Sequence, residues 1–445
     1  MKKLMLSLVG MVAATAFAPQ ASALPAFARQ TGMACNACHQ QHFPVLNTFG
    51  RSFKAAGYTM VGGQSMVEGE HLSIPGTLNA AILIKMRYQS QTNGDAGGSL
   101  RDGSGEVQAV GDPATGGMLQ MGNEFSLFFG GRIAENIGFL MENNVAAQAG
   151  PLVAGLRMPI MFDTANAKVS VIPFSTDALG VSYGYELSSA GVMRANRWAE
   201  LRRDSSAIQY AIADGNNSHG NYSGAAAGLA LVGQNEMGFI NLTKWTPNAM
   251  PGGNDGGIVS YSPDSSYVRI AATPNVNGWD MVAGVGMMSG SAELAGAGIV
   301  GIVDSGVVKT EAKFADLQAH GQVAGKDMGV YVTWANAPGF AAGQRAQLFN
   351  KGTEDKSAVA VGVDYSLIPH VLHVGGAYRQ GKTGNLAAGS TSSQTDNAVM
   401  LQAIYDLTQN VALHVAGASR TGTKYTQATP AVGEKEYILM LEAAW

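Results

Sequence analysis

The chain has 445 residues, a formal net charge of −4, 13% charged residues, 46% apolar residues and 58 glycines. The near-neutral balance supplies no basic surface for nucleic acid. No run of about 18 apolar residues follows residue 24, which excludes a bundle of membrane-spanning helices. The length would hold two or three soluble domains, so the pattern along the chain has to decide the class.

Residues 1–23 have the features of a secretory signal peptide. Lys2 and Lys3 form a positive start, Leu4 to Phe17 is apolar, and Ala21-Ser22-Ala23 is a small-x-small cleavage signature. The apolar stretch is too short for a membrane helix. We therefore expect an exported chain whose mature form begins at Leu24.

Both cysteines of the chain lie in Cys35-Asn36-Ala37-Cys38-His39. This spacing is typical of covalent haem attachment, in which two thiols form thioethers and the next histidine binds the iron. A local disulfide, a thioredoxin-like pair and a zinc site are the other interpretations. No βαβ pattern surrounds the motif, and one histidine with two cysteines is too few for a closed zinc site. We predict one haem c on Cys35 and Cys38, with His39 as the iron ligand and the redox-active residue.

The segment after the motif predicts a short helix. Within Val45 to Ala56, Leu46, Phe49 and Phe53 share one apolar face, and Gly57-Tyr58 would end the helix. About fifty residues are marginal as an independent fold, although a covalent haem adds apolar surface. We predict an α-helical cytochrome module over 24–76, small enough to plug the lumen of a barrel.

The second axial ligand of the haem stays open between several residues. His42 is close in sequence to His39 and is expected to be too near to reach across the haem. The lumenal histidines, His373 and His414, could bind only if the module is inserted. The downstream candidates are Met60, Met66 and His71. Methionine in place of histidine would raise the reduction potential.

From residue 77 to 445 the sequence alternates between apolar and more polar residues. In the first such segment Leu78, Ala80, Ile82, Ile84, Met86 and Tyr88 share the apolar face, opposite Asn79, Ala81, Leu83, Lys85 and Arg87. The same period recurs from Leu179 to Leu187, Val359 to Leu367, Val399 to Tyr405 and Val411 to Val415. Segments of about ten residues with this period predict a transmembrane β-barrel with a polar lumen.

The connections between these segments alternate in length. Short ones fall at 134–136, 174–177, 233–236, 274–278, 323–326, 368–370 and 407–410. Long ones fall at about 91–117, 150–163, 188–221, 248–265, 290–308, 338–356, 381–396 and 421–434. This predicts sixteen antiparallel strands, provided that 204–213 is loop or helix, with both chain ends on the short-turn side. In bacterial outer-membrane barrels that side is the periplasm.

The last segment alternates through Tyr437, Leu439, Leu441 and Ala443 to a terminal Trp445. It is expected to pair with the first strand, so that the barrel has no open edge. A soluble β-sandwich is the other interpretation, but it does not require loops and turns to be sorted by length. We predict an all-β fold, with an outer-membrane barrel over 77–445.

Charged residues fall into two expected groups. Those expected to line a hydrated lumen are Lys85, Arg87, Glu124, Arg132, Glu142, Lys168, Glu186, Asp364, His373, Arg379 and Glu442. Those expected in solvated loops, where they could attract cations, are Asp102, Glu106, Asp112, Asp255 and Glu354. No catalytic carboxylate pair, nucleophile triad or phosphate loop stands out.

The N-terminal residues resemble a known family. Pro25 to Gly32, the motif from Cys35 to His39, and Phe49-Gly50-Arg51 with Gly57-Tyr58-Thr59 are similar to the fused monohaem cytochrome–porins, the outer-membrane iron oxidases of iron-oxidising bacteria. The detailed match covers about residues 25–60. The resemblance implies a haem domain joined to a sixteen-stranded barrel, which oxidises extracellular Fe(II) and passes electrons to a periplasmic c-type cytochrome.

A physical argument points the same way, and three alternatives stay open. Ferric iron is nearly insoluble at neutral pH, so oxidising Fe(II) outside and importing only electrons benefits the cell. The same conduit could instead carry electrons outward to extracellular acceptors. A diffusion porin with a structural or sensory haem would conduct solutes. A soluble periplasmic cytochrome would not fractionate with the outer membrane.

Overall fold

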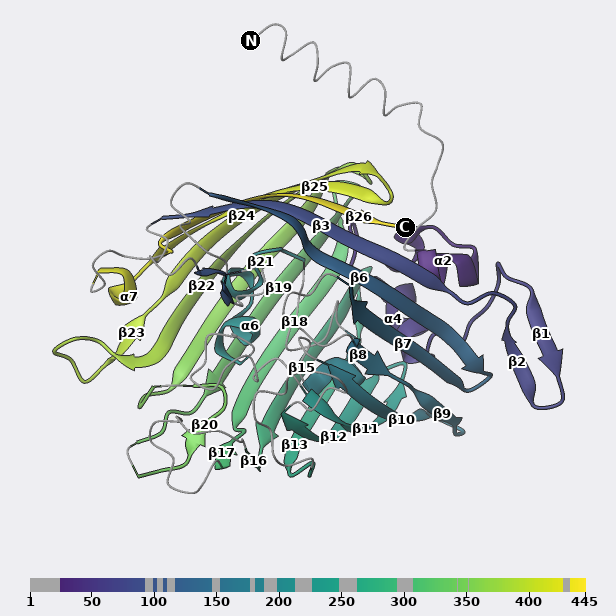
Figure 1. Cartoon of the computed structure of the whole chain (residues 1–445), viewed down its shortest axis with the longest axis horizontal. Coiled ribbons are helices and arrows are strands. Elements are labelled where there is room, and N and C mark those ends of the chain that lie inside the picture. The colour runs from purple at the N-terminus through teal and green to yellow at the C-terminus, as the bar shows by residue number, and fades with distance from the viewer. Residues whose placement is uncertain are drawn as a thin grey trace, which may run out of the picture.

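The computed structural model describes residues 25–92, 99–101, 107–109, 117–145, 153–176, 181–187, 198–212, 226–247, 262–293, 307–341, 343–350, 352–426 and 433–445. These form a closed antiparallel barrel with inserted segments in its lumen (Figure 1). No helix in these ranges is long and apolar enough to cross a bilayer. The predicted signal peptide and the acidic residues Asp102, Glu106, Asp112 and Asp255 lie outside the described residues.

Within the described residues, the barrel wall has the predicted sixteen strands. Three of them are interrupted: β8/β9, β13/β14 and β23/β24. Each is counted as one wall strand because both of its halves pair with the same neighbouring strand. In chain order the wall strands are β3 (Ala80–Gln91), β6 (Met118–Ala134), β7 (Ile137–Asn144), β8 (Val153–Arg157), β9 (Ile160–Asp163), β10 (Lys168–Thr176), β11 (Ala226–Asn235), β12 (Gly238–Pro247), β13 (Ser265–Ala272), β14 (Asn275–Val276), β15 (Trp279–Ser289), β18 (Ala312–Val323), β19 (Lys326–Ala337), β21 (Lys356–Ile368), β22 (Leu372–Leu386), β23 (Ser393–Thr395), β24 (Asn397–Thr408), β25 (Val411–Thr421) and β26 (Lys435–Ala444).

The last strand closes the barrel against the first. In this pair Leu439 faces Tyr88, and Glu442 faces Lys85. The backbone of Trp445 continues the ladder by exchanging hydrogen bonds with Ile82 at 2.7 and 3.0 Å. Closure pairs the backbone groups of both end strands and removes the open edge, as the alternation predicted.

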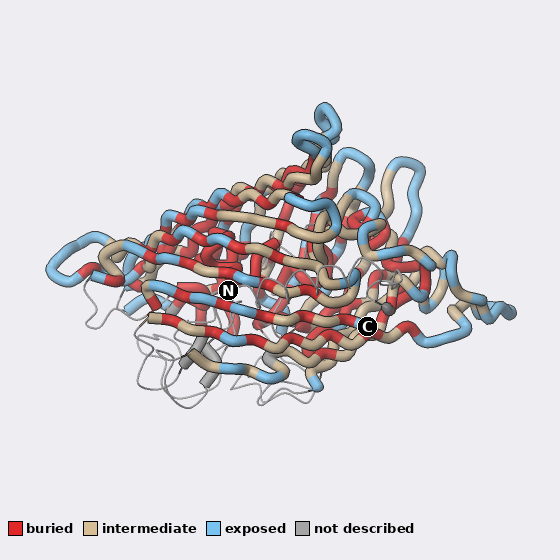
Figure 2. Tube along the Cα trace, turned by 90° about the horizontal axis from the view of Figure 1, so that it is seen from above, coloured by how far each residue is buried: buried red, intermediate tan, exposed pale blue. Residues whose placement is uncertain are grey.

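The two faces of the wall differ as predicted. In β3 the lumenal Lys85 and Arg87 are buried, whereas Tyr88 on the other face is 41% exposed. Figure 2 shows the same alternation of buried and less buried residues along the other strands. Outward-facing apolar residues that are about half exposed include Leu231, Leu242, Ile270, Val285, Val361, Leu401 and Leu439. So large an apolar band around a closed barrel requires a hydrocarbon environment, so this is a transmembrane barrel.

The alternation of turns and long connections is also confirmed, with one correction. The predicted fourth and fifth strands were placed one segment too late along the chain. The true fourth strand is β8/β9, inside the predicted loop 150–163, and the next short turn is 164–167 rather than 174–177. Pro159 separates β8 from β9 because it lacks the N–H that a ladder needs. The fourth strand and the fifth strand both move one segment earlier in the chain, so the number of strands stays at sixteen.

The segment from Leu179 to Leu187 is predicted as a strand, but its described part, 181–187, is not one; residues 179 and 180 lie outside the described residues. Residues 181–184 form a 3₁₀ helix, η1 (Val181–Gly184), in the connection between β10 and β11. Residues of both parities are buried there, including Tyr183, Glu186 and Ser182. The alternation misled because this segment lies inside the barrel, where neither face meets lipid or water. The lumenal placement of Glu186 is correct, but a loop provides it rather than a wall strand.

The same connection inserts two short helices, α5 (Arg202–Ser205) and α6 (Ala207–Ala211), as expected for 204–213. We call the described parts of this connection, 181–187 and 198–212, the inserted loop. The ring of Trp198 stacks on Tyr331 at 5.3 Å. It also lies so close to Gly362 and Gly375 that a Cβ on either would meet the indole within 2.5 Å. These lumen-facing glycines therefore form a slot for the tryptophan.

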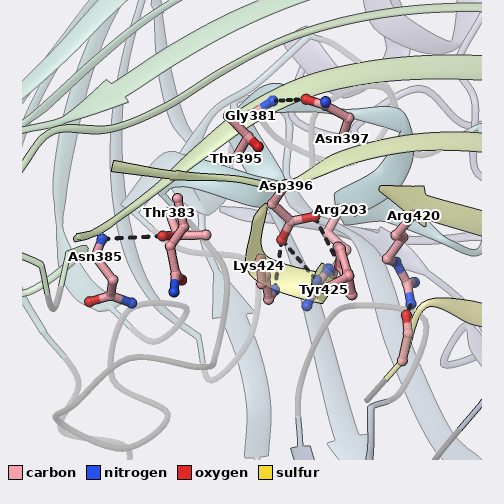
Figure 3. A network of polar contacts seen from close by, with 12 residues as sticks. Arg203, Gly381, Thr383, Asn385, Thr395, Asp396, Asn397, Arg420, Lys424 and Tyr425 are labelled. Atoms are coloured by element: carbon pink, nitrogen blue, oxygen red, sulfur yellow. Dashed lines mark hydrogen bonds and ion pairs between the residues drawn. The ribbon is translucent and has the colours of Figure 1, made fainter. Parts of the chain in front are cut away.

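Buried ion pairs hold the inserted loop against the wall. Asp204 of α5 pairs with Arg420 at 2.5 Å and with Arg379 at 3.4 Å. Arg203 lies 3.8 Å from Asp396. Figure 3 shows Asp396 beside Arg203, Lys424 and Tyr425, the last two from α7 (Thr423–Thr426). Acidic and basic groups taken out of water are paired here, which offsets the cost of burying them.

Small sheets lie outside the wall. β1 (Met66–Gly69) and β2 (Leu72–Pro75) form a hairpin that extends from the barrel at the end where α2 lies (Figure 1). The other small sheets are β4 (Ser99–Arg101) with β5 (Val107–Ala109), and β16 (Ser291–Glu293) with β17 (Val307–Lys309) and β20 (Ala346–Gln347). They belong to the long connections.

Candidate functional site

The N-terminal segment, residues 25–64, contains three helices: α2 (Pro25–Thr31), α3 (Cys35–Cys38) and α4 (Thr48–Ala55). Asn47 caps α4 by accepting a hydrogen bond from the Gly50 amide at 2.9 Å. Gly57, at φ +63°, lies just after the end of the helix, as predicted. The predicted apolar face is only partly buried, because Phe53 is buried while Phe49 is 37% exposed.

This segment fills the short-turn mouth of the barrel, because it contacts strands around the whole circumference. Thr48 donates a hydrogen bond to Asp280 of β15, and Gln41 donates to the carbonyl of Asp327 in β19 at 3.2 Å. Gln234 of β11 donates to the carbonyl of Ala55 at 2.9 Å. Opposite them, α2 packs on β3 and β6. The module is therefore inserted.

Cys35 and Cys38 lie on the single turn of α3, and both are partly buried and form no disulfide. Side chains three residues apart on a helix share a face, as two attachments to one haem require. Sγ of Cys35 lies 3.3 Å from the carbonyl of Gln409, in the short turn between β24 and β25. Burial, with a smaller effect of Cys35, raises the pKa of the Cys38 thiol.

The imidazole of His39 directly follows this turn. Its Nδ1 lies 3.3 Å from the carbonyl of Val45, which can accept a hydrogen bond from an Nδ1–H. Burial lowers the pKa of His39 to about 4, so the ring is neutral at physiological pH. A neutral ring with its Nδ1 proton on a carbonyl has its lone pair on Nε2, the form that binds iron. The donor set of Cys35, Cys38 and His39 therefore fits a haem c.

Close packing fixes the motif in place. A Cβ at Gly50 would lie 2.1 Å from the carbonyl oxygen of Cys38, so only glycine lets α4 approach α3 this closely. The side chain of Asn47 also donates to the carbonyl of Ala37 at 3.1 Å. The close packing of α4 on α3 therefore explains why a glycine stands in the Phe49-Gly50-Arg51 run, next to the Cys35–His39 motif.

The candidate second ligands lie in different places. Met66 and His71 belong to the protruding β1–β2 hairpin, where the His71 side chain is 92% exposed, and the structure does not bring them to His39. Met60 lies beside α2, where its carbonyl accepts a hydrogen bond from Gln30 at 2.8 Å. His373 and His414, in contrast, are buried in the wall next to the inserted module.

His42 is the residue that joins the module to these lumenal histidines. Its Nδ1 lies 2.8 Å from Asp406, and its Nε2 lies 3.1 Å from Glu442. Its ring is 5.2 Å from that of His414. Burial disfavours the charged ring, but hydrogen bonds to both carboxylates prevail and raise the pKa of His42 to about 9. No sequence pattern indicated this cluster, because its members are hundreds of residues apart.

The N-terminal segment and the inserted loop meet in the lumen. The Arg157 guanidinium lies over both the Tyr58 ring of the segment, at 5.4 Å, and the Tyr183 ring of the loop, at 4.5 Å. The two parts also come together at Trp198, where a small cavity lies between them. Residues that line it include Gln41, His42, Phe43, Trp198, Asp364 and His373.

The predicted lumenal charges are found on the inner face of the wall. Buried there are Lys85, Arg87, Asp364, His373, Arg379 and Glu442, and partly buried are Glu124, Arg132, Glu142 and Lys168. The expected hydration of a simple channel is wrong for the buried set, because protein groups surround them. Lys85, for example, pairs with Glu124 at 2.7 Å. Glu354 is exposed, as expected of a loop residue.

Comparison with known proteins finds likeness among solved structures. No protein-family model matches the chain, and no curated protein matches it. A loop-deletion form of OmpT, an outer membrane protein of Vibrio cholerae, is 9% identical, with 83% of this chain and 99% of that chain covered and a TM-score of 0.46.

Two further solved structures are similar to the same extent. The outer membrane channel DcaP of Acinetobacter baumannii is 11% identical, over 83% of this chain and 97% of that chain, with a TM-score of 0.47. OccK1 (OpdK) of Pseudomonas aeruginosa is 11% identical, over 82% of this chain and 98% of that chain, with a TM-score of 0.42. Likenesses this distant carry no argument about activity, cofactor or partner.

Proposed function

We propose that this chain is an outer-membrane electron conduit, an iron oxidase that takes electrons from extracellular Fe(II) and delivers them to a periplasmic c-type cytochrome. Cys35 and Cys38 would hold one haem c covalently, and Nε2 of His39 would bind its iron. When bound, the haem supplies a one-electron redox centre. The observation that carries the proposal is the insertion of this motif into the short-turn mouth, with the His39 ring oriented through Nδ1.

The position of the motif suits exchange with a soluble partner. Asn36, between the two cysteines, is exposed, and Cys35 lies at the β24–β25 turn. A periplasmic cytochrome docking on this end of the barrel would therefore approach the attachment site directly. The other end of the barrel carries the long loops, through which Fe(II) would enter from outside. The choice of Fe(II) rests on the resemblance to the cytochrome–porins.

The test is stopped-flow absorbance of the purified, detergent-solubilised protein mixed anaerobically with Fe(II). We expect the reduced haem spectrum to appear rapidly, and His39→Ala to abolish it. His370→Ala, in the exposed turn between β21 and β22, is the matched control and should behave as wild type. Reduction by dithionite but not by Fe(II) would overturn iron as the donor. Absence of covalent haem would overturn the conduit itself.

A diffusion porin is the second candidate, because a sixteen-stranded barrel is the size that encloses an aqueous channel in porins. The filled lumen speaks against it: the N-terminal segment blocks one mouth, and the inserted loop packs onto it. Single-channel recording in planar bilayers separates the two candidates. The conduit predicts conductance far below that of an open sixteen-stranded porin, and a porin-like value would favour the diffusion channel.

A further inference from the structure

We propose that His42, His414 and Glu442 form a binding site for a divalent first-row transition metal ion, separate from the haem motif. Only the naming of Fe(II) as the physiological ion rests on the proposed function. The site itself rests on the arrangement of its own ligands, which come from the N-terminal segment (His42), β25 (His414) and β26 (Glu442).

The three side chains converge as a metal site requires. One ligand atom from each lies within 4.8 Å of the others. Oε1 of Glu442 lies 3.1 Å from Nε2 of His42 and 3.3 Å from Nε2 of His414. All three atoms therefore face one point, and small movements of the side chains would bring them to the distances of about 2.0–2.2 Å found at metal ions.

His414 supplies an independent observation. It is 6% exposed, and its Nε2 forms an ion pair with Oε1 of Glu442 at 3.3 Å whose geometry is poor for a hydrogen bond. A buried ring nitrogen held by one poorly aligned carboxylate makes a weaker interaction than a well-formed hydrogen bond would. A metal ion bound by Glu442 and His42 would satisfy this nitrogen.

The surroundings also hold the ligands in the orientation that a metal requires. Asp406 binds Nδ1 of His42 at 2.8 Å, which leaves Nε2 for the metal. His373 in turn binds Asp406 at 2.9 Å. Carboxylates on the far nitrogen of a ligating histidine are the usual second partners at metal sites. Metal binding would release the proton that lies between His42 and Glu442.

The chemistry of the ligands selects the class of ion. Two imidazoles and one carboxylate suit Fe(II), Zn(II) and their neighbours, whereas Ca²⁺ and Mg²⁺ prefer ligands that are all oxygen. Lys85 lies 3.6 Å from the second oxygen of Glu442 and is paired with Glu124 as well. One positive charge near the site weakens cation binding, so we expect moderate affinity, which suits a substrate ion that must leave.

The site borders a small cavity inside the barrel and lies next to the Cys35–His39 motif. His42 and His373 line the small cavity between the N-terminal segment and Trp198. His42 is three residues after His39 in sequence. Fe(II) bound here would be held on the lumenal side of the attachment motif, as a donor site requires.

The test is equilibrium dialysis of the full-length, detergent-solubilised protein against Co(II), a stable probe for this ligand set, with the metal quantified by elemental analysis. We expect one Co(II) per chain, and at least a tenfold loss of affinity in His414→Ala. His42→Ala changes no wall strand, so it gives the same comparison if the barrel variant fails to fold. His370→Ala is the matched histidine control, and equal binding by all four proteins would overturn the site.

The haem spectrum of the same samples distinguishes the site from an axial ligand. We expect an unchanged ferric spectrum in His414→Ala. A shift to the high-spin form would make His414 the second haem ligand and overturn the proposal. Co(II) binding without haem reduction by Fe(II) would leave the metal site standing and sink the iron oxidase instead. Fe(II) reduction at the wild-type rate in His414→Ala would exclude the site as the donor site.

Discussion

The two segments that fill the lumen differ in how they are held. In the inserted loop every residue of α5 and α6 is buried, and the acidic residue of α5, Asp204, pairs with two arginines. In the N-terminal segment α3 has no buried residue, and only half of α4 is buried. Single hydrogen bonds to several strands, together with the contacts of His42 with Asp406 and Glu442, hold it in place. The loop has the character of a structural core, whereas the segment keeps its reactive groups partly accessible.

This contrast teaches where chemistry can be placed in a filled barrel. On the proposed function, the thiols react with a haem and the His39 ring binds iron, so these groups cannot be enclosed in a dry ion-pair network. The inserted loop lies beside this segment, where Trp198 lines a cavity together with Gln41, His42 and Phe43. The following changes test this division of roles.

The largest effect is expected from the cysteine pair. Cys35→Ala combined with Cys38→Ala should abolish covalent haem completely, because no other cysteine exists in the chain. Haem staining after denaturing electrophoresis measures this. Asn36→Ala, between the same two cysteines, is the control and should keep its haem. Staining of the double variant at wild-type intensity would refute the attachment site.

The next effect is on the inserted loop. Asp204→Ala leaves Arg420 and Arg379 buried with one partner fewer, and losing one partner of a buried ion pair costs about 3–5 kcal/mol. We expect α5 to leave the wall and the conductance in planar bilayers to rise. Glu354→Gln, at an exposed carboxylate, is the control. Unchanged conductance in Asp204→Ala would mean that the ion pairs do not hold the loop.

A smaller effect is expected from pH on the same group. Burial alone would raise the pKa of Asp204, but Arg420, Arg203 and Arg379 lower it to about 2. The charged form thus stabilises the docked loop above pH ~4, and this contribution, about 2 kcal/mol, is lost as pH falls from ~4 to ~2. Conductance should rise over that range. In Asp204→Asn this pH-dependent step should be absent.

The smallest effect is expected in the N-terminal segment. Asn47→Ala removes the cap of α4 and a bond to Ala37, at a cost of about 1 kcal/mol. Hydrogen exchange should become faster in α4 and stay unchanged in α6. Ser52→Ala, exposed on the same helix, is the control. Equal acceleration in α6 would show that the N-terminal segment and the inserted loop unfold as one unit rather than being held separately.

Much of the wall was predictable because strand signals are local. Tyr437 to Trp445 alternates by a backbone rule that any strand on a lipid surface obeys, and the structure follows it. The same rule failed at Val181 to Leu187, where both faces are covered by protein. It also failed at β8/β9, because Pro159 interrupts the alternation there, although β7 and β10 on either side pair with this strand.

The candidate site divides in the same way. The sequence alone determined the spacing of Cys35, Cys38 and His39 and the end of α4 near Gly57, because helical turns are set by residues a few positions apart. Only the tertiary structure decided that this segment enters the barrel mouth and that His42 meets Glu442, 400 residues away. Such meetings depend on the strand register and closure of the whole wall, which no local pattern encodes.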